Sequence, residues 1–347
     1  MSMKAKILEL LREKKERVAA GAPEGEAYVS GQELCEQFGV SRTAVWKAIG
    51  QLKKEGYVIE AVQNRGYRLL DQAEEVYNQA DVQSRLKTKW VAHPLQFFDS
   101  IDSTNIRAKL EAEQGAESGL LVVADMQSAG RGRRGRGWES PAGTNIYYTL
   151  MLKPDFSSDC APMLTLVMAL AVAKGIRQTL RRDSEEVAAK VGIKWPNDIV
   201  VDGKKVCGIL TEMSMEQGYI QHIVIGVGIN VRKQEFPEEI RDRAAAIDEQ
   251  CGFRISRSQL IADIMEAFEE DYEIFLQTHD LKGLRASYAE LLVNQDREVC
   301  VLDPKGEYRG IARGINDQGE LLVERPDGNV EEVYAGEVSV RGIYGYV

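Results

Sequence analysis

The chain has 347 residues, of which 44% are hydrophobic and 28% charged, and its formal net charge is −10. This is the balance of a globular protein, and at roughly 100–200 residues per domain it predicts two or three domains. No uninterrupted run of roughly 18 apolar residues occurs and the N-terminus leads into charged sequence, so neither a transmembrane helix nor a secretory signal is expected. The five cysteines are scattered without a C-x-x-C pair and the three histidines lack metal-ligand spacing, which predicts reduced thiols in a cytoplasmic protein without structural zinc.

Charge is distributed unevenly along the chain. Residues 1–70 hold 12 Lys and Arg against 9 Asp and Glu, whereas the remaining residues hold 32 against 45. An acidic body argues against bulk binding of polyanions, but a positive N-terminal part fits a small DNA-compatible head.

The first seventy residues predict a winged helix-turn-helix. Apolar spacing favours a helix over residues 4–19. Ser30 and Glu33 form a capping box for a short helix that stops at Gly39, and Ser41 caps a second helix that runs to about Lys54. Two short β-like runs, 57–62 and 67–70, follow around a turn at 63–66.

The second helix of such a motif enters the major groove of DNA. Its exposed side carries Arg42, Thr43 and Lys47, and Arg65 lies at the tip of the wing, within reach of phosphate or the minor groove. The alternative is a winged helix that makes only protein contacts.

An acidic linker, 71–81, separates this head from a mixed α/β region. Two long apolar segments, 161–180 and 257–275, predict helices, and the predicted strands cover residues 96–98, 119–124, 145–150, 193–195 and 220–227. Because strands and helices do not alternate regularly, a mixed sheet backed by helices is expected rather than a doubly wound parallel one.

Residues 127–138, with the sequence QSAGRGRRGRGW, hold four glycines and four arginines and almost no core-forming side chain. Glycines let a backbone close on a ligand, and arginines offer forked donors to phosphate or carboxylate. We expect a loop that is disordered when empty and ordered around an anion. An RNA-binding arginine–glycine segment or a solvated linker is the alternative, but a single short loop between two strands favours an active-site loop.

Three further segments place polar residues or glycines next to predicted strands. KWPNDI at 194–199 places Lys194 and Asp198 beside a proline-fixed turn, where they could serve nucleotide and magnesium. GKKVCGIL at 203–210 predicts a hairpin that leads into a buried strand. GVGIN at 226–230 is not a Rossmann fingerprint because no third glycine follows, and its glycines predict close backbone approach to a ligand. No P-loop sequence occurs, so any nucleotide is not held by a P-loop. No nucleophile elbow or Cys/His pair occurs either, so covalent enzyme catalysis lacks support.

The C-terminal part predicts a small β-barrel, most simply SH3-like. Its predicted strands are 297–302, 307–315, 320–325 and 329–340, with turns at 304–306, 317–319 and 326–328. A capping domain without chemistry explains this part as well as a direct substrate role does.

Taken together, these motifs resemble the BirA family of bifunctional biotin–protein ligases and biotin operon repressors. The resemblance covers essentially the whole chain and rests on five segments: 102–105 (DSTN), 127–138, 194–198, 204–210 and 226–230. It implies an α/β multidomain fold: a winged helix-turn-helix at 1–72, a class II synthetase-like mixed α+β ligase domain at 73–292, and an SH3-like barrel at 293–347.

The resemblance implies a two-step reaction that needs biotin, ATP and Mg²⁺. Biotin's carboxylate attacks the α-phosphorus of ATP to give biotinyl-5′-AMP and pyrophosphate, and a lysine of a carboxylase acceptor domain, the biotin carboxyl carrier protein, then attacks the mixed anhydride. It further implies repression of biotin synthesis and uptake genes at operator DNA, with the adenylate as corepressor that promotes a homodimer. A loop over the anhydride suits this chemistry because it limits hydrolysis.

The resemblance also implies residue roles. Lys205, Arg131 and Arg133 are expected to neutralise the reacting carboxylate and phosphate and so to be catalytic. The residues implied for biotin are Ser103, Thr104, Asn105, Gln127, Gly130, Arg131, Gly132, Arg133 and Lys205. Those implied for ATP and the adenylate are Arg134, Arg136, Trp138, Lys194, Asn197, Asp198 and Asn230. Asp198 is the candidate magnesium ligand, and a simple helix N-cap is the alternative role for residues 103–105.

Two other functions remain open. A lipoate- or octanoate-type ligase shares the catalytic architecture, although a DNA-binding head and the paired Gly-Arg repeats argue against it. A transcription regulator that only senses a ligand is disfavoured by the complete set of catalytic motifs.

Overall fold

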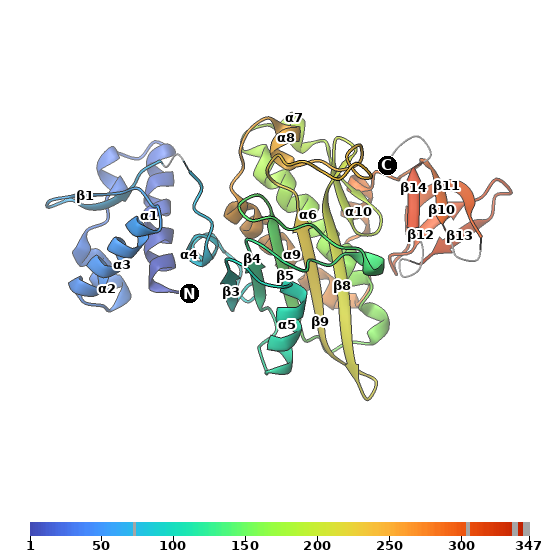
Figure 1. Ribbon diagram of the computed structural model, residues 1–347, viewed down its shortest axis with the longest axis horizontal. Coiled ribbons are helices and arrows are strands. Elements are labelled where there is room, and N and C mark those ends of the chain that lie inside the picture. The colour runs from blue at the N-terminus through green and yellow to red at the C-terminus, as the bar shows by residue number, and fades with distance from the viewer. Residues whose placement is uncertain (72–73, 303–305, 335–338, 343–347) are drawn as a thin grey trace. The chain divides into compact units, whose positions relative to one another are not determined.

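A computed structural model describes residues 1–71, 74–302, 306–334 and 339–342 of the chain (Figure 1). The chain divides into two compact units, residues 1–86 and residues 87–347. Each unit has its own hydrophobic core and is described by itself.

The first unit contains three helices followed by a β-hairpin and a short fourth helix. Its elements are α1 (Met3–Ala19), a 3-10 turn (Glu24–Ala27), α2 (Gly31–Phe38), α3 (Arg42–Lys54), β1 (Ile59–Val62), β2 (Gly66–Leu69) and α4 (Gln79–Gln83). The predicted N-caps are confirmed: the Ser30 hydroxyl accepts from the Glu33 amide at 3.0 Å, the Ser41 hydroxyl accepts from the Ala44 amide at 3.3 Å, and Gly39 is left-handed. The Glu33 carboxylate, which a capping box directs back to Ser30, lies 3.6 Å from the Lys14 ammonium.

The core of this unit is formed by the faces that apolar spacing predicts. Ile7, Leu8 and Leu11 of α1 meet the α3 stripe, in which Leu52 is fully buried. At the hairpin, a Cβ on Gly66 would lie 2.0 Å from the carbonyl oxygen of Val29, so this position requires glycine.

The prediction of an acidic linker over 71–81 is wrong at its end. Asp81 lies in α4 and is 1% exposed, and it pairs with Arg12 of α1, the Tyr57 hydroxyl and Arg85. Burial and its contact with Asp81 raise the pKa of the Tyr57 phenol. A buried carboxylate requires such partners, so Asp81 fixes α4 against the three-helix core rather than solvating a linker. Residues 72–73 lie outside the described chain.

The second unit is built on a seven-stranded mixed sheet, as the irregular strand pattern predicts. Its order is β3-β4-β5-β9-β8-β7-β6, in which β3 and β4 are parallel and every other neighbouring pair is antiparallel. The strands are β3 (Leu95–Phe98), β4 (Leu121–Ala124), β5 (Ile146–Leu152), β6 (Val191–Lys194), β7 (Asp198–Val201), β8 (Lys204–Glu216) and β9 (Tyr219–Ile229).

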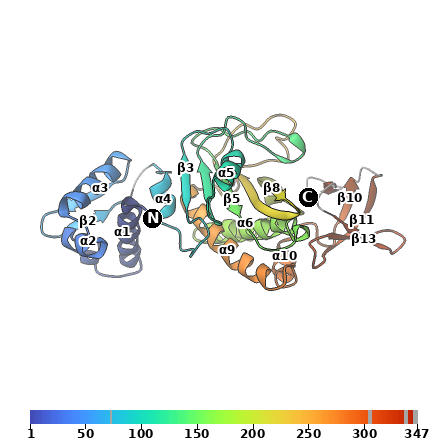
Figure 2. The same ribbon diagram turned by 90° about the horizontal axis from the view of Figure 1, so that it is seen from below.

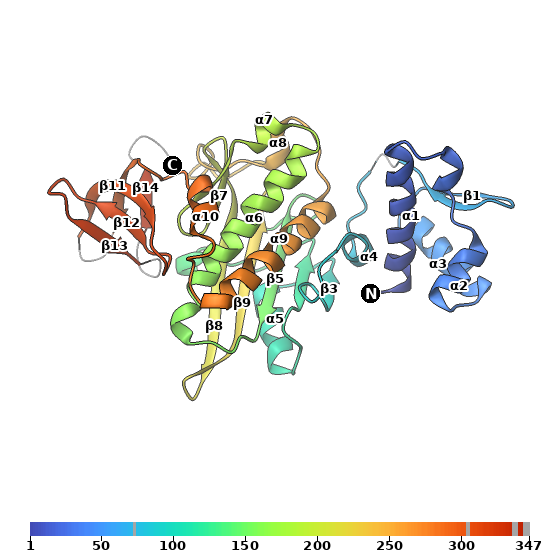
Figure 3. The same ribbon diagram turned by 180° about the vertical axis from the view of Figure 1, so that it is seen from behind.

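Helices cover both faces of this sheet (Figures 2 and 3). One face carries α6 (Met163–Arg181) and α9 (Arg257–Thr278), which lie so close that a Cβ on Gly175 would lie 2.5 Å from an Ile264 side-chain carbon. The other carries α5 (Thr104–Glu113), whose Ala108 and Ala112 pack on β4, β5 and β9. Of the described residues, one segment, 158–181, is long and apolar enough to cross a membrane, but 72% of its apolar window is buried, as expected of a core helix.

The shorter elements of this unit connect the sheet and its helices. They are α7 (Glu185–Ala188), α8 (Ile247–Cys251), α10 (Arg285–Leu291) and two 3-10 turns at Arg133–Gly135 and Ser158–Cys160.

A second, five-stranded antiparallel sheet forms the C-terminal part, in the order β13-β12-β11-β10-β14. Its strands are β10 (Glu298–Leu302), β11 (Tyr308–Ile315), β12 (Leu321–Glu324), β13 (Val330–Val333) and β14 (Ser339–Gly342). The predicted single strand over 329–340 is wrong, because β13 and β14 lie at opposite edges of the sheet. The predicted turn at 304–306 lies mostly outside the described residues.

Candidate functional site

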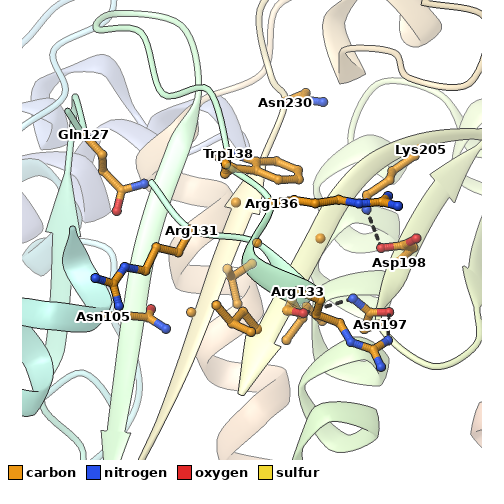
Figure 4. Close-up of a pocket in the computed structure, with 18 of the residues that line it drawn as sticks. Asn105, Gln127, Arg131, Arg133, Arg136, Trp138, Asn197, Asp198, Lys205 and Asn230 are labelled. Atoms are coloured by element: carbon orange, nitrogen blue, oxygen red, sulfur yellow. Dashed lines mark hydrogen bonds and ion pairs between the residues drawn. The ribbon is translucent and has the colours of Figure 1, made fainter. Parts of the chain in front are cut away.

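A cavity of about 320 Å³ lies on the face of the large sheet that carries α5 (Figure 4). The segment 127–138 crosses it, and strands β8 and β9 form its floor. Most of the predicted site residues line it: Ser103, Thr104, Asn105, Gln127, Arg131, Gly132, Arg133, Arg134, Arg136, Trp138, Asn197, Asp198, Lys205 and Asn230. The structure therefore brings together segments that are about 130 residues apart in the sequence.

One end of the cavity is formed by neutral polar groups at the start of α5. The Thr104 amide donates to the Gln127 side-chain oxygen at 2.9 Å, and the Thr104 hydroxyl lies 3.1 Å from the same oxygen. Ser103 holds the N-cap position without a side-chain cap bond, so capping is not what its hydroxyl does here. The N-terminus of α5 is thus hydrogen-bonded to the loop at Gln127, and polar oxygens of both line the cavity.

Asn105 is 5% exposed, and its carboxamide makes hydrogen bonds at both ends. Its oxygen accepts from the Thr149 hydroxyl at 2.6 Å, and its nitrogen donates to Glu212 at 2.7 Å. A Cβ on Gly226 would lie 2.1 Å from the Asn105 oxygen, so β9 needs glycine where this side chain crosses it.

The loop 127–138 folds back on itself above the sheet. The Trp138 amide donates to the Gly130 carbonyl, Arg131 and Gly137 form an isolated bridge, and a Cβ on Gly130 would lie 2.3 Å from the Trp138 carbonyl oxygen. Gly130 therefore shapes the loop and is absent from the cavity lining itself. The expectation that ligand orders this loop stays a prediction.

The Trp138 ring lies across β8 and β9. A Cβ on Gly228 would approach the indole to 2.5 Å, and one on Gly208 would approach it to 2.9 Å. The Lys205 ammonium is 5.6 Å from the ring centroid. Gly226 and Gly228 line the cavity, and the side chains of Asn105 and Trp138 lie closest to them. The expectation that these glycines admit a ligand stays a prediction.

The other end of the cavity is charged. The Lys205 ammonium lies 2.5 Å from an Asp198 oxygen, and Arg133 donates to the Asn197 carboxamide at 2.8 Å (Figure 4). Burial lowers the pKa of the Arg133 guanidinium, and the nearby Asp198 charge opposes that shift. Arg136 extends towards Lys205 and Asp198 in the same view. Cationic groups in a partly enclosed space are suited to bind oxyanions.

Lys194 does not reach this cavity. It ends β6, is 6% exposed, and pairs in register with Asp198, the first residue of β7. Its place in the adenylate site stays a prediction that the lining residues do not support.

Sequence reasoning missed one wall of the cavity, which is formed by Ile240, Arg243 and Ala244. The Lys205 amide donates to the Arg243 carbonyl at 2.7 Å, so this segment also holds the backbone of the candidate catalytic lysine. No motif marks these residues, and nothing local in the sequence could have indicated them.

The candidate DNA-binding residues lie in the first unit. Arg42, Thr43 and Lys47 are exposed on α3, and Arg42 donates to the Gln32 side chain at 3.0 Å. Arg65, at the hairpin tip, lines a groove with Arg42 and lies 5.5 Å from the Tyr28 ring centroid. Trp46, which no sequence pattern singled out, is 71% exposed on α3.

Three family models match the chain. They are an HTH domain over residues 24–68, the biotin/lipoate A/B protein ligase family over residues 97–230, and a biotin protein ligase C-terminal domain over residues 296–341. These matches confirm the expected order of a helix-turn-helix, a ligase domain and a C-terminal domain.

Curated relatives match nearly the whole chain. A bifunctional ligase/repressor BirA from Bacillus subtilis is 36% identical over 91% of this chain and 95% of its own length. The protein of the same description from Escherichia coli is 32% identical over 90% of this chain and 92% of its length.

A solved structure supports the same assignment for the second unit. Biotin protein ligase from Aquifex aeolicus in complex with biotin and ATP is 29% identical, with a TM-score of 0.60 over 72% of this chain and 98% of that one. The fold, the cavity and the relatives agree, and the chain belongs to the BirA family of bifunctional biotin ligase/repressors.

Proposed function

We propose that the chain joins biotin to a carboxylase by way of an adenylate. The observation that carries this proposal is a single cavity with a neutral hydrogen-bonding end at Asn105 and Gln127 and a cationic end at Lys205 and Arg133. A ligand with a polar uncharged ring at one end and a carboxylate at the other, followed by a nucleotide, matches these two ends.

In the first step, a carboxylate oxygen of biotin attacks the α-phosphorus of ATP. The new bond is the mixed anhydride of biotinyl-5′-AMP, and pyrophosphate leaves with the electrons of the broken P–O bond. Both reactants are anions, so Lys205, Arg131 and Arg133 stabilise the transition state by lowering their repulsion. In the second step, the uncharged amine of an acceptor lysine attacks the anhydride carbonyl, AMP leaves, and the amine loses a proton.

The assignments of individual residues are part of this proposal. The neutral end and the loop hold biotin through Ser103, Thr104, Asn105, Gln127, Gly130, Arg131, Gly132, Arg133 and Lys205. The charged end holds ATP and the adenylate through Arg134, Arg136, Trp138, Lys194, Asn197, Asp198 and Asn230. The Trp138 ring, which already spans β8 and β9, covers the anhydride and limits its hydrolysis.

Magnesium is proposed at Asp198. Asp198 is the one carboxylate among the described residues that line the cavity, and no group of three or more His, Cys, Asp or Glu side chains suited to a metal occurs among the described residues. This set fits an ion bound mainly by nucleotide phosphates with one protein carboxylate. The ion would neutralise charge at the phosphates, while Lys205 holds the Asp198 carboxylate in place.

The first unit is proposed to read operator DNA as a winged helix-turn-helix. Arg42, Thr43 and Lys47 on α3 would face the major groove, and Arg65 of the β1–β2 wing would face phosphate or the minor groove. One such reader contacts few base pairs, so we propose that the adenylate promotes a homodimer that spans two half-sites. Unbiotinylated acceptor would compete for the surface that forms this homodimer and would so relieve repression.

Finer points of architecture belong to the same proposal. They are the domain limits 1–72, 73–292 and 293–347, a class II synthetase-like ligase domain, an SH3-like form for the C-terminal sheet, and a cytoplasmic location.

The experiment that tests the proposed function is incubation with biotin, ATP, magnesium and a carboxylase acceptor domain, followed by mass measurement of the acceptor. We expect a mass gain of one biotinyl group that depends on ATP. Because the matching family model covers both biotin and lipoate ligases, lipoate and octanoate form parallel arms. Transfer of either acyl group in place of biotin would contradict the proposal.

A further inference from the structure

A chain of hydrogen bonds runs from the neutral end of the cavity to an ion pair at its edge. Lys109 donates to one oxygen of Glu212 at 2.7 Å, and Asn105 donates to the other at 2.7 Å. The Asn105 oxygen lies 2.6 Å from the Thr149 hydroxyl. The Thr149 hydroxyl in turn lies 2.8 Å from the Thr104 hydroxyl. Of these residues, only Thr104 and Asn105 line the cavity.

The carboxylate determines which end of the Asn105 amide faces which neighbour. An ionised carboxylate only accepts hydrogen bonds, so the Asn105 group that faces Glu212 is the nitrogen. The amide oxygen therefore faces Thr149, and it can only accept. Because a hydroxyl has one proton, Thr149 donates that proton to Asn105 and can only accept from Thr104.

The Thr104 hydroxyl also has a single proton and two acceptor neighbours. It lies 2.8 Å from the Thr149 oxygen and 3.1 Å from the Gln127 oxygen. Two oxygens without a proton between them repel each other more strongly at the shorter distance, so the proton lies towards Thr149. The Thr104 and Gln127 oxygens are then left as adjacent acceptors in the cavity lining, with no proton between them.

Such a pair of acceptors is complementary to an N–H donor, which can interact with both oxygens. A cyclic urea presents N–H groups of this kind, whereas a ring without them leaves the two oxygens in contact. The negative charge of Glu212, where the chain of hydrogen bonds starts, is favoured by its surroundings. Partial burial of Glu212 favours the neutral acid, but the hydrogen bonds from Lys109 and Asn105 outweigh it and hold the pKa below its ordinary value.

We propose that Glu212, held by Lys109, is a positioning residue that fixes the direction of this hydrogen-bond chain and so presents Thr104 and Gln127 as acceptors for the N–H groups of biotin's cyclic urea. The inference rests on the proposed function. Glu212 acts through Asn105 and Thr149 and does not itself touch the ligand.

An exchange of amide and carboxylate tests this direction. Glu212→Gln removes the charge that enforces it, and we expect biotin to bind about 5- to 10-fold more weakly to the full chain by calorimetry. Asn105→Asp places two carboxylates face to face, for which we expect a loss of about 30-fold or more. In the double variant Asn105→Asp/Glu212→Gln, the new glutamine amide donates to the new aspartate, which still accepts from Thr149. We expect binding to return to within about 5-fold of wild type.

A purely structural role for Glu212 predicts a different pattern, in which the double variant is at least as weak as Asn105→Asp alone. That result, or a Glu212→Gln variant that binds biotin within twofold of wild type, would overturn the inference. ATP affinity monitors folding and should remain near wild type in all variants. The melting temperature should fall only in Asn105→Asp, where two carboxylates face each other, and should recover in the double variant. Glu216→Gln on the same strand, whose side chain contacts exposed Gln221, is the matched control and should change nothing.

Biotin binding by the wild-type chain and the role of Glu212 are tested separately. Wild-type chain that binds ATP but no biotin would contradict the proposed function. Wild-type chain that binds biotin, combined with no recovery in the double variant, would contradict only the role of Glu212.

Discussion

The two ends of the cavity are built by different means. At the neutral end, Asn105, Thr104 and Thr149 lie on regular elements and are each at most 5% exposed with several hydrogen bonds. The loop adds Gln127 and the side chain of Arg131, which lies beside Asn105 in Figure 4. The charged end consists of Lys205 at the start of β8 and of the loop residues Arg133 and Arg136, of which Arg136 is exposed. The first end is fixed before a ligand arrives, whereas the second contains excess positive charge that an anion would neutralise. We infer that the neutral end selects the ligand and the charged end performs the chemistry.

The largest expected effect comes from removal of the cation closest to the proposed reaction. Lys205→Ala should lower the rate of adenylate synthesis about 100-fold or more, because two anions then approach without its charge. Biotin affinity should fall less than about 10-fold, since the neutral end is intact. Rapid-quench measurement of biotinyl-AMP gives the rate, and exposed Lys204→Ala is the neighbouring control. A rate within twofold of wild type would remove Lys205 from the mechanism.

Substitution of two glycines on β9 distinguishes the roles of the two ends of the cavity. Gly226→Ala forces a methyl group to 2.1 Å from the Asn105 oxygen, and Gly228→Ala forces one to 2.5 Å from the Trp138 ring. Overpacking of this kind costs about 2 kcal/mol, equivalent to about 30-fold in affinity. We expect the first variant to lose biotin affinity and keep ATP affinity, and the second to release the adenylate faster.

Calorimetry and adenylate-release kinetics on both variants provide the test. If the two substitutions reduced biotin affinity equally and left adenylate release unchanged, the division of labour between the ends would be wrong.

Charged residues that face solvent outside the cavity should affect neither end. Arg42→Ala combined with Lys47→Ala should weaken operator binding about 10-fold or more, because α3 loses two cations on its exposed side. Ligase activity should be unchanged. An operator titration beside an acceptor biotinylation assay measures both, and normal operator binding by the double variant would show that α3 is not the reader.

The smallest expected effect concerns the loop itself. Trypsin should cleave after the arginines of residues 130–137 in the ligand-free chain, since the backbone hydrogen bonds described for this segment stay within residues 130–138. Biotin with ATP should slow cleavage several-fold, because anions at the charged end hold the arginines. Equal cleavage rates with and without ligands would mean that the loop does not order over them.

Local features were predictable from the sequence because their causes are local. Ser30 and Ser41 begin helices and Gly39 ends one, each through a hydrogen bond with a backbone group three or four residues away. Apolar periodicity identifies α3. The last predicted strand failed because the one glycine in residues 329–340, Gly336, was not taken as a break, and nothing local indicates that the following strand pairs at the far edge of the sheet.

The site was predictable only in part for the same reason. Motifs identify Asn105, Lys205 and Trp138, but the partners that orient them are distant in sequence. Glu212 lies 107 residues from Asn105 along the chain, and the wall at Arg243 follows no motif. Such contacts arise from strand register and the return of the chain after β9, which composition and spacing do not encode.

Exchange of labelled pyrophosphate into ATP tests the central claim most directly, because it reports the first step without an acceptor. The account predicts exchange by the wild-type chain that requires biotin and is lost in Lys205→Ala. Absence of exchange in the presence of biotin, by chain that binds biotin normally, would contradict the account and favour a regulator that senses its ligand without activating it.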